Sequence, residues 1–204
     1  MSMTLAALLL LQSGAPCAAA GRSTDQDRAG LNVRAAPSAN ARVVGRLYSV
    51  DDPVMAEGGG WPPRYGPVFA IRDARNGWVR IDGAAAESEG YDGEVRRNYT
   101  GPGWVSANYV ETTVVMVGTG DPARQGYSGP GFESAVADPD GLTNIERMTR
   151  ALRRPARVIA CRGPWVQLEY VRMGRLGPDE RWRDFPVAQR VPARAWFRSG
   201  EPGE

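Results

Sequence analysis

The hydrophobic and polar positions of the chain first follow a regular pattern at residues 31–34, LNVR, where apolar and polar residues alternate. This period of two is that of a half-buried β-strand, with Leu31 and Val33 on one face. Residues 37–40, PSAN, have turn chemistry, and apolar residues resume within 43–47. The pattern predicts a hairpin-like unit, with which we expect the folded part of the chain to begin.

A second hairpin is predicted further along, where the apolar runs 68–71 and 78–81 flank a short turn at 73–77. A polar excursion, residues 83–102, then leads to GWVSANYVETT at 103–113. We expect a strand there whose middle, SANY, forms one tight helical turn before the chain resumes as strand.

One helix is predicted in the second half of the chain. Thr143 and Glu146 have the spacing of a capping box, and Pro155 should end the helix. Helical spacing places apolar residues on one face and arginines on the other: Ile145, Met148 and Leu152, against Arg147, Arg150 and Arg154. We interpret the arginines as a solvated face, favoured by the negative end of the helix dipole, with an anion site as the alternative.

A third hairpin is predicted at residues 157–161 and 165–171, around Gly163 and Pro164. It repeats features of the earlier one: an apolar strand, a tight turn, then Trp-Val and an alternating strand. GWVSANY at 103 likewise finds a counterpart in AWFRSGE at 195. Repeated order of this kind suggests duplicated units.

Tryptophan precedes valine at Trp78, Trp104 and Trp165, each in a predicted strand. We expect these three rings to lie largely in the cores.

Three stretches are not expected to form regular structure. Residues 48–67 hold a triple glycine and a double proline, which predicts a loop. Residues 113–140 are rich in Gly, Pro and Asp and are predicted to be a linker. The polar residues 21–29 are predicted to be a flexible lead-in.

The N-terminus has the pattern of a signal peptide, residues 1–20. An apolar run at 5–11, too short to span a bilayer, is followed by small residues that end at Ala20, after which we expect cleavage. A buried helix or a tail is the alternative, because the segment before the run carries no basic side chain.

The chain has two cysteines, Cys17 and Cys161. Cleavage after Ala20 would remove Cys17 and leave Cys161 alone within a predicted strand. A lone cysteine in a strand is more often a small buried apolar residue than a reactive thiol. A disulfide between the two would require that the signal is not cleaved there.

Composition excludes several reaction classes. The 204 residues include no His, and all 25 basic residues are Arg. Without His there is no Ser-His-Asp or Cys-His nucleophile system and no imidazole metal site, and without Lys there is no Schiff base or phosphate-loop lysine. Neither catalytic residues nor a cofactor or metal is therefore expected, and the net charge of +2 argues against nucleic-acid binding.

Charge is uneven along the chain. Residues 21–140 carry 12 Arg against 16 acidic residues, a net of −4, whereas residues 141–204 carry 13 Arg against 7, a net of +6. The two halves would attract each other, or different partners.

Taken together, LNVRAAPSANARVVGRL, NGWVRI and GPGWVSANYV resemble the bacterial Src-homology-3-like domain (SH3b), over about residues 30–112. The resemblance implies a mainly all-β fold with a small five-stranded barrel at 30–112. Residues 141–200 resemble the same fold only in the Trp-Val hairpin and the AWF ending. They are expected to form a degenerate second SH3-like barrel with a short helix.

Domains of this family in exported bacterial proteins are similar in role to targeting modules that hold cell-wall peptide or glycan. The resemblance thus implies a non-catalytic, periplasmic or secreted binding module with no membrane span once the signal is removed. A periplasmic protein-interaction scaffold that uses the two oppositely charged halves is one alternative. A carboxylate-dependent envelope glycan hydrolase is another, with loop acids at Glu57, Glu87, Glu89 and Asp92.

The candidate ligand-binding residues are four loop aromatics and one arginine: Trp61, Tyr65, Tyr91, Tyr99 and Arg34. The aromatics could form a stacking rim for sugar or peptide, or could equally hold their own loops in place. Arg34 points away from the predicted core. We expect it to pair with a loop carboxylate such as Asp51 or Asp52 more readily than to bind ligand.

Overall fold

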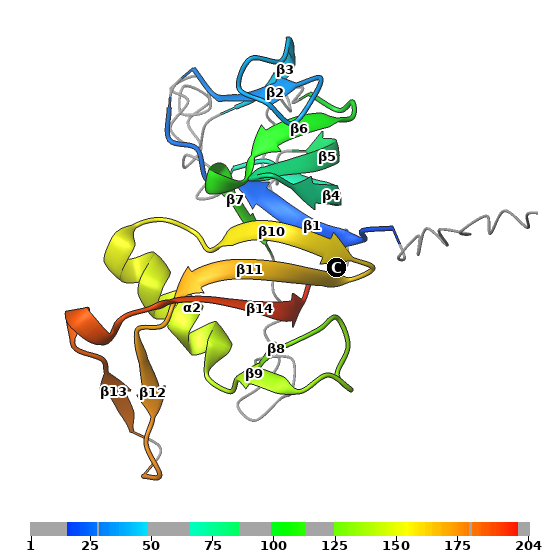
Figure 1. The fold of residues 1–204 in the computed structure, drawn as a ribbon. Coiled ribbons are helices and arrows are strands. Elements are labelled where there is room, and N and C mark those ends of the chain that lie inside the picture. Colours follow the sequence, from blue (N-terminus) through cyan, green and yellow to red (C-terminus); the bar gives the residue numbers. More distant parts are fainter. Residues whose placement is uncertain are drawn as a thin grey trace, which may run out of the picture.

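The structure is a computed structural model, and it describes residues 16–27, 29–48, 66–85, 99–112, 125–179 and 181–199. Antiparallel strands form most of this part of the chain, together with one α-helix and two short 3-10 turns (Figure 1). The predicted all-β class is confirmed. Several residues singled out in the sequence lie outside the described residues: Trp61, Tyr65, Tyr91, Asp51, Asp52, Glu57, Glu87, Glu89 and Asp92.

The first half forms one seven-stranded sheet in the order β3-β2-β6-β5-β4-β1-β7. Its elements are β1 (Ala19–Ser23), β2 (Leu31–Arg34), β3 (Val43–Leu47), β4 (Val68–Arg75), β5 (Trp78–Ala85), β6 (Gly103–Ser106), the 3-10 turn η1 (Ala107–Tyr109) and β7 (Val110–Thr112). The hairpin-like unit at 31–47 and the strand interrupted by SANY are confirmed.

The turn between β4 and β5 is shorter than expected. The prediction ended the first strand at Ile71, but β4 continues to Arg75, and only Asn76 and Gly77 form the turn. Both have positive φ, 53° and 76°, as a two-residue hairpin turn with the twist of its strands requires.

Residues 19–23, which the sequence analysis divided between a signal peptide and a flexible lead-in, form strand β1. This strand pairs with β4 on one side, from Ala19↔Ile71 onward, and with β7 on the other, up to Ser23↔Val110. Small residues allow this position, because a Cβ at Gly21 would lie 2.9 Å from Cδ1 of Ile71. Cleavage after Ala20 would cut through a strand in the interior of the sheet.

The second half forms a five-stranded sheet in the order β10-β11-β14-β8-β9 and a separate two-stranded ribbon, β12-β13. Its elements are β8 (Gly126–Tyr127), β9 (Val136–Asp138), α2 (Gly141–Leu152), β10 (Arg157–Arg162), β11 (Trp165–Val171), β12 (Gly174–Leu176), β13 (Trp182–Asp184), the 3-10 turn η3 (Val187–Gln189) and β14 (Pro192–Arg198). The predicted hairpin around Gly163 is confirmed. The predicted linker is wrong where it covers β8 and β9, because both strands pair into this sheet.

Helix α2 begins before the predicted capping box. Its N-cap is Asp140, so Thr143 lies inside the first turn, and the helix ends at Leu152, before Pro155. Met148 is buried and Ile145 packs against the core, but Leu152 is 43% exposed. The buried face starts at Leu142 instead, because the helix lies over β11 with its N-terminal half.

A buried carboxylate, Asp138, holds the start of this helix. Asp138 Oδ2 accepts hydrogen bonds from Tyr170 Oη (2.6 Å), Arg172 Nε (3.1 Å) and Asn144 Nδ2 (3.3 Å). Asn144 Oδ1 in turn accepts the backbone N–H groups of residues 173 and 174, at 2.7 and 3.1 Å. The network therefore connects β9, α2 and the end of β11.

Burial of the Trp-Val pairs differs from the prediction. Val79, Val105 and Val166 are fully buried, whereas Trp78 and Trp165 are only half-buried. Successive side chains of a strand point to opposite faces, so a Trp and the Val that follows it cannot both fill the same core. Trp104 is buried on the opposite face, where the Arg75 guanidinium lies 4.7 Å from its ring centroid.

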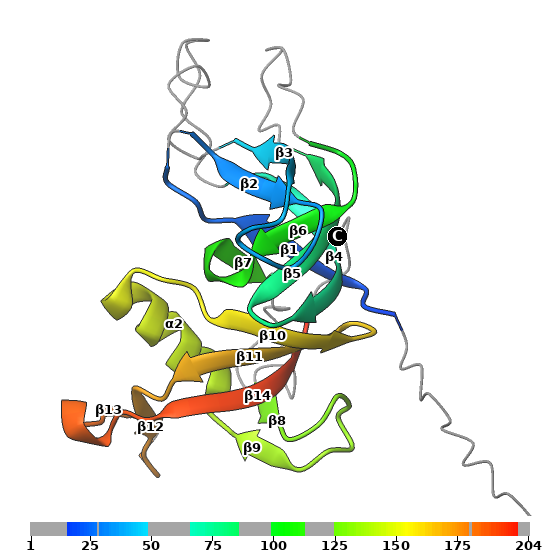
Figure 2. The same cartoon turned by 45° about the horizontal axis from the view of Figure 1, so that its top comes forward.

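The two halves share one hydrophobic core. Strand β10 lies across β4, β5 and β7, and the buried cluster runs from Phe69 and Ile71 of the first sheet to Val158 and Phe197 of the second (Figure 2). Comparable three-strand arrangements, β4-β5-β6 and β10-β11-β14, recur in the two sheets. The remaining strands differ, and no counterpart of LNVR is present in the described second half.

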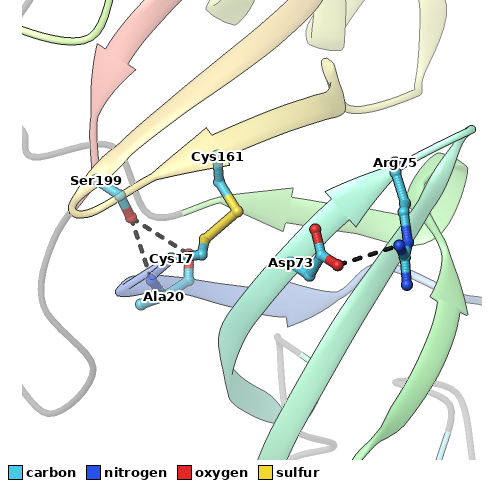
Figure 3. Close-up of a disulfide and its surroundings, with 6 residues drawn as sticks. All are labelled: Cys17, Ala20, Asp73, Arg75, Cys161 and Ser199. Carbon is cyan, nitrogen blue, oxygen red and sulfur yellow. Dashed lines mark hydrogen bonds and ion pairs between the residues drawn. A yellow bond between two sulfur atoms is a disulfide. The ribbon is translucent and has the colours of Figure 1, made fainter. Parts of the chain in front are cut away.

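A disulfide joins the halves covalently. Cys17 and Cys161 are bonded with a Cα–Cα distance of 5.4 Å (Figure 3). In the full chain Cys161 is therefore paired, the outcome that the sequence analysis made conditional on a signal that is not cleaved after Ala20. The fold brings the cysteines together because the residues just before β1 lie beside the β10–β11 turn, where Cys17 and Gly163 form a parallel bridge. Local sequence patterns do not reveal this contact.

Candidate functional site

A cavity of about 240 Å³ opens on the first half, where the segment after β1 meets β2, β5 and η1. Its walls combine acids, an arginine, hydroxyl and amide groups and two aromatic rings. It is lined by Asp25, Asp27, Gly30, Leu31, Asn32, Arg34, Trp78, Ser106 and Tyr109.

Short-range hydrogen bonds shape the acidic wall. The Asp25 N–H donates to Ser23 Oγ, and the Asp27 N–H donates to Asp25 Oδ1, both at 3.3 Å. Asp27 Oδ1 accepts the Ala29 N–H at 2.9 Å, and its carbonyl accepts the N–H of Gly30 at 2.7 Å. Turns of this Asx type favour Asp and Asn, which explains why the chain bends at Asp25 and Asp27.

Glycine is required at the end of this turn. Gly30 has φ +76°, and a Cβ there would lie 2.3 Å from the Leu47 carbonyl oxygen. The chain can therefore pass close to β3 and enter β2 with Asn32 facing the cavity.

Asp25 and Asp27 differ in their surroundings. Asp25 is 6% exposed, and burial raises the pKa of its carboxyl above the ordinary 3.8, with the nearby Asp27 charge acting in the same direction and backbone hydrogen bonds opposing. Asp27 is exposed. Together with Arg34, the cavity has two potential negative charges and one positive charge.

The aromatic wall comes from two neighbouring elements. Trp78 begins β5 opposite Ser106 of β6, and Tyr109 lies in η1 with 44% of its surface exposed. Aromatic faces beside carboxylates are suited to ligands that carry both apolar surface and positive charge.

Of the two predicted site residues that the structure describes, Arg34 and Tyr99, Arg34 lines this cavity. Its Nη1 donates to the Ala41 carbonyl oxygen at 2.7 Å, which fixes the side chain across the β2–β3 connection. Asp51 and Asp52, the expected partners, lie outside the described residues.

Tyr99 lies elsewhere, against β3. A Cβ at Gly45 would come within 2.2 Å of Cδ2 of the Tyr99 ring, and the Tyr99 hydroxyl donates to the Pro102 carbonyl at 3.1 Å. With these contacts Tyr99 anchors its own loop, which is the alternative role considered for the loop aromatics. The structure places Tyr99 and Arg34 in different surroundings.

Eight of the nine lining residues were not among the predicted site residues, including the two acids Asp25 and Asp27 and the two aromatic residues Trp78 and Tyr109. The two acids fall in the stretch predicted to be a flexible lead-in, and Trp78 was assigned to the core. The strand alternation around Val79 was the signal that could have placed Trp78 on the outer face.

A larger cavity of about 490 Å³ lies between the two halves. It is lined by Arg22, Glu111, Thr112, Leu142, Ile145, Glu146, Thr149, Arg150, Ala156 and Leu168. Arg22 and Glu111 form an ion pair at 2.7 Å on its wall. Its described lining includes no aromatic ring, whereas the smaller cavity combines aromatic rings with carboxylates and an arginine.

Within the described ranges, no group of three or more His, Cys, Asp or Glu side chains is arranged to hold a metal ion. The loop acids Glu57, Glu87, Glu89 and Asp92 lie outside these ranges. The same ranges contain no helix with the length and apolarity needed to cross a membrane.

The geometry of the smaller cavity is thus the main guide to function. Comparison of the chain with protein-family models, with curated proteins and with solved structures finds no match.

Proposed function

We propose that this protein is an exported, non-catalytic binding module that recognises cell-wall peptide or glycan through the cavity between Asp25 and Tyr109. The observation that carries the proposal is the combination, in one surface cavity, of two carboxylates, an oriented arginine and two aromatic rings. A few polar groups beside aromatic surface are typical of sites for small polar ligands. The sequence resemblance to SH3b domains is consistent with this role.

Among wall components, the cavity is best suited to a peptide with an ammonium group. Asp25 is held in a buried position, where a charge-assisted hydrogen bond is stronger than in water. Asp27 adds a second negative charge at the rim, and Arg34 offers a donor for a peptide carbonyl or carboxylate. Neutral glycan would use the aromatic rings but would offer no opposite charge to these groups.

Removal of the exposed aromatic ring should weaken wall binding. We expect Tyr109→Ala to reduce affinity for purified peptidoglycan about tenfold, the effect of losing one aromatic contact in a small site. Sedimentation of the protein with peptidoglycan measures the bound fraction across concentrations. Phe132→Ala is the matched control, since Phe132 is also 44% exposed but lies in the second half. Equal retention of both variants and the wild type would contradict the proposed site.

Binding should also depend on pH through Asp25. Its raised pKa means that the free protein protonates Asp25 at pH values where an ordinary Asp is ionised, and a bound ammonium favours the ionised form. Affinity for an ammonium-bearing wall peptide is expected to rise as pH increases through the interval above 3.8, and Asp25→Asn should flatten this rise. Calorimetric titration at several pH values measures it. A rise that persists in Asp25→Asn would assign the dependence to another group.

A protein-interaction scaffold is the second candidate function. It is favoured by the β12–β13 ribbon, which projects from the second half (Figure 1), and by exposed apolar side chains in β12 and in the segment that follows β13. These are Leu176, Val187 and Val191, at 48%, 76% and 51% exposed. Two results together would favour this candidate. Cross-linking in the envelope would capture one protein and lose it in Leu176→Ser, and the wild type would not be retained on peptidoglycan.

A further inference from the structure

We infer that the mature protein keeps Cys17 bonded to Cys161, and that its leader is removed upstream of Cys17, within residues 12–16. The inference rests on the proposed export, and it changes the processing site from the one indicated by the small residues that end at Ala20. It follows from how the segment around Cys17 is built into the fold.

The segment from Pro16 to Ala20 is hydrogen-bonded to the second half. The Ala18 N–H donates to the Gly163 carbonyl at 2.8 Å, and the Gly163 N–H donates to the Pro16 carbonyl at 3.1 Å. Cys17 and Gly163 form a parallel bridge beside the disulfide. The disulfide therefore closes an arrangement that the backbone already forms.

The other end of this segment is held by Ser199. The Ala20 N–H donates to Ser199 Oγ at 3.2 Å, and Ser199 Oγ lies 3.5 Å from the Ala20 carbonyl, as Figure 3 shows. The Ser199 N–H itself donates to the Pro164 carbonyl at 2.7 Å. Cys17 is 5% and Ala19 0% exposed, so these contacts are within the core.

Cleavage after Ala20 would remove this whole arrangement. The sheet would lose the register pairs Ala19↔Ile71 and Ala20↔Ala70, and Cys161 would be left as a thiol without its partner. Cleavage within residues 12–16 avoids both losses. Ser13, Gly14 and Ala15 are small residues that directly follow the apolar run, as a leader cleavage site requires.

Formation of the bond needs an oxidant in the compartment where the chain folds. The two cysteine thiols together lose two protons and two electrons. The disulfide of an oxidoreductase or of oxidised glutathione accepts them by thiol–disulfide exchange and is reduced to two thiols. Such conditions hold outside the cytosol. The link spans 144 positions of sequence, so it constrains a long loop of the unfolded chain.

The test expresses residues 1–204 with a C-terminal tag in a bacterium with an oxidising periplasm. The N-terminus of the exported protein is sequenced, its intact mass is measured before and after reduction, and its thiols are counted by alkylation. We expect an N-terminus within residues 13–16, no reactive thiol before reduction, two after it, and a mass gain of two hydrogen atoms. An N-terminus at Gly21, retention of the leader, or free thiols in the folded protein would overturn the inference.

A second measurement holds whether or not the host exports the chain. The purified full chain is oxidised with oxidised glutathione, and thermal unfolding is compared with Cys17→Ser, Cys161→Ser and the double variant. Reductant should lower the Tm of the wild type by about 10 °C. All three variants should match the reduced wild type and should not respond to reductant. An unchanged Tm in fully reduced wild type contradicts a stabilising role. Peptidoglycan binding is measured separately. If the protein with an intact disulfide does not bind peptidoglycan, that result counts against the proposed function and not against this inference.

Discussion

Asp138→Ala is expected to lower the free energy of unfolding by about 3–5 kcal/mol, as removal of one partner from a buried charged network does. The change leaves the Tyr170 hydroxyl and the Asn144 amide without their acceptor, and it removes the partner of Arg172. Tyr170 remains a donor in the native network, since burial raises the pKa of its phenol above the ordinary range and the Asp138 hydrogen bond raises it further. Urea unfolding measures the change as a shift of the midpoint at unchanged slope.

Asp179→Ala is the matched control for this prediction. Asp179 pairs with Arg183 at 3.4 Å on the surface of the β12–β13 ribbon, where its side chain is 46% exposed. An exposed ion pair of this kind contributes less than about 1 kcal/mol. If both variants cost the same, the network around Asp138 is not what holds α2 against the sheet.

Phe197→Ala is expected to destabilise the protein by about 3–5 kcal/mol, through lost burial and the cavity that remains. Phe197 is fully buried, and its ring contacts Tyr170 edge-on with centroids 5.8 Å apart. Two glycines make room for it: a Cβ at Gly141 would lie 2.8 Å from the ring, and a Cβ at Gly126 3.1 Å. Thermal and urea unfolding both measure the effect.

The control here is Trp196→Ala, the neighbour of Phe197 on the opposite face of β14. Trp196 is only half-buried, so we expect a smaller loss than for Phe197 although more atoms are removed. A larger loss for Trp196→Ala would show that the outer face of this sheet, and not the shared core, dominates stability.

Local patterns predicted the hairpins because each depends on residues close in sequence. The alternation in LNVR, the Asn76-Gly77 turn and the Gly163-Pro164 connection each carry their own conformational preference. The helix was found for the same reason, although its start was placed too late at Thr143. Asp140 occupies the N-cap without a side-chain cap bond, so the cap preference did not decide the boundary.

The structure of residues 16–27 was not predicted, because nothing local marks these residues as structured. Small and polar residues around Gly21 favour a cleavage site or a loop when read alone. In the fold, the same small side chains allow β1 to lie between β4 and β7 against Ile71. The acidic wall of the candidate site was therefore not predicted either, and the disulfide was left conditional on where the signal is cleaved.

The β-rich class, the positions of the hairpins and the absence of His and Lys chemistry follow from composition and from neighbouring residues. Three features depend on the packing of the whole chain: β1 joins the first sheet, Cys17 meets Cys161, and Asp25 and Tyr109 line one cavity. These contacts join residues far apart in the chain. Their formation depends on how the two sheets share one core, and no local preference for strand, turn or burial encodes that packing.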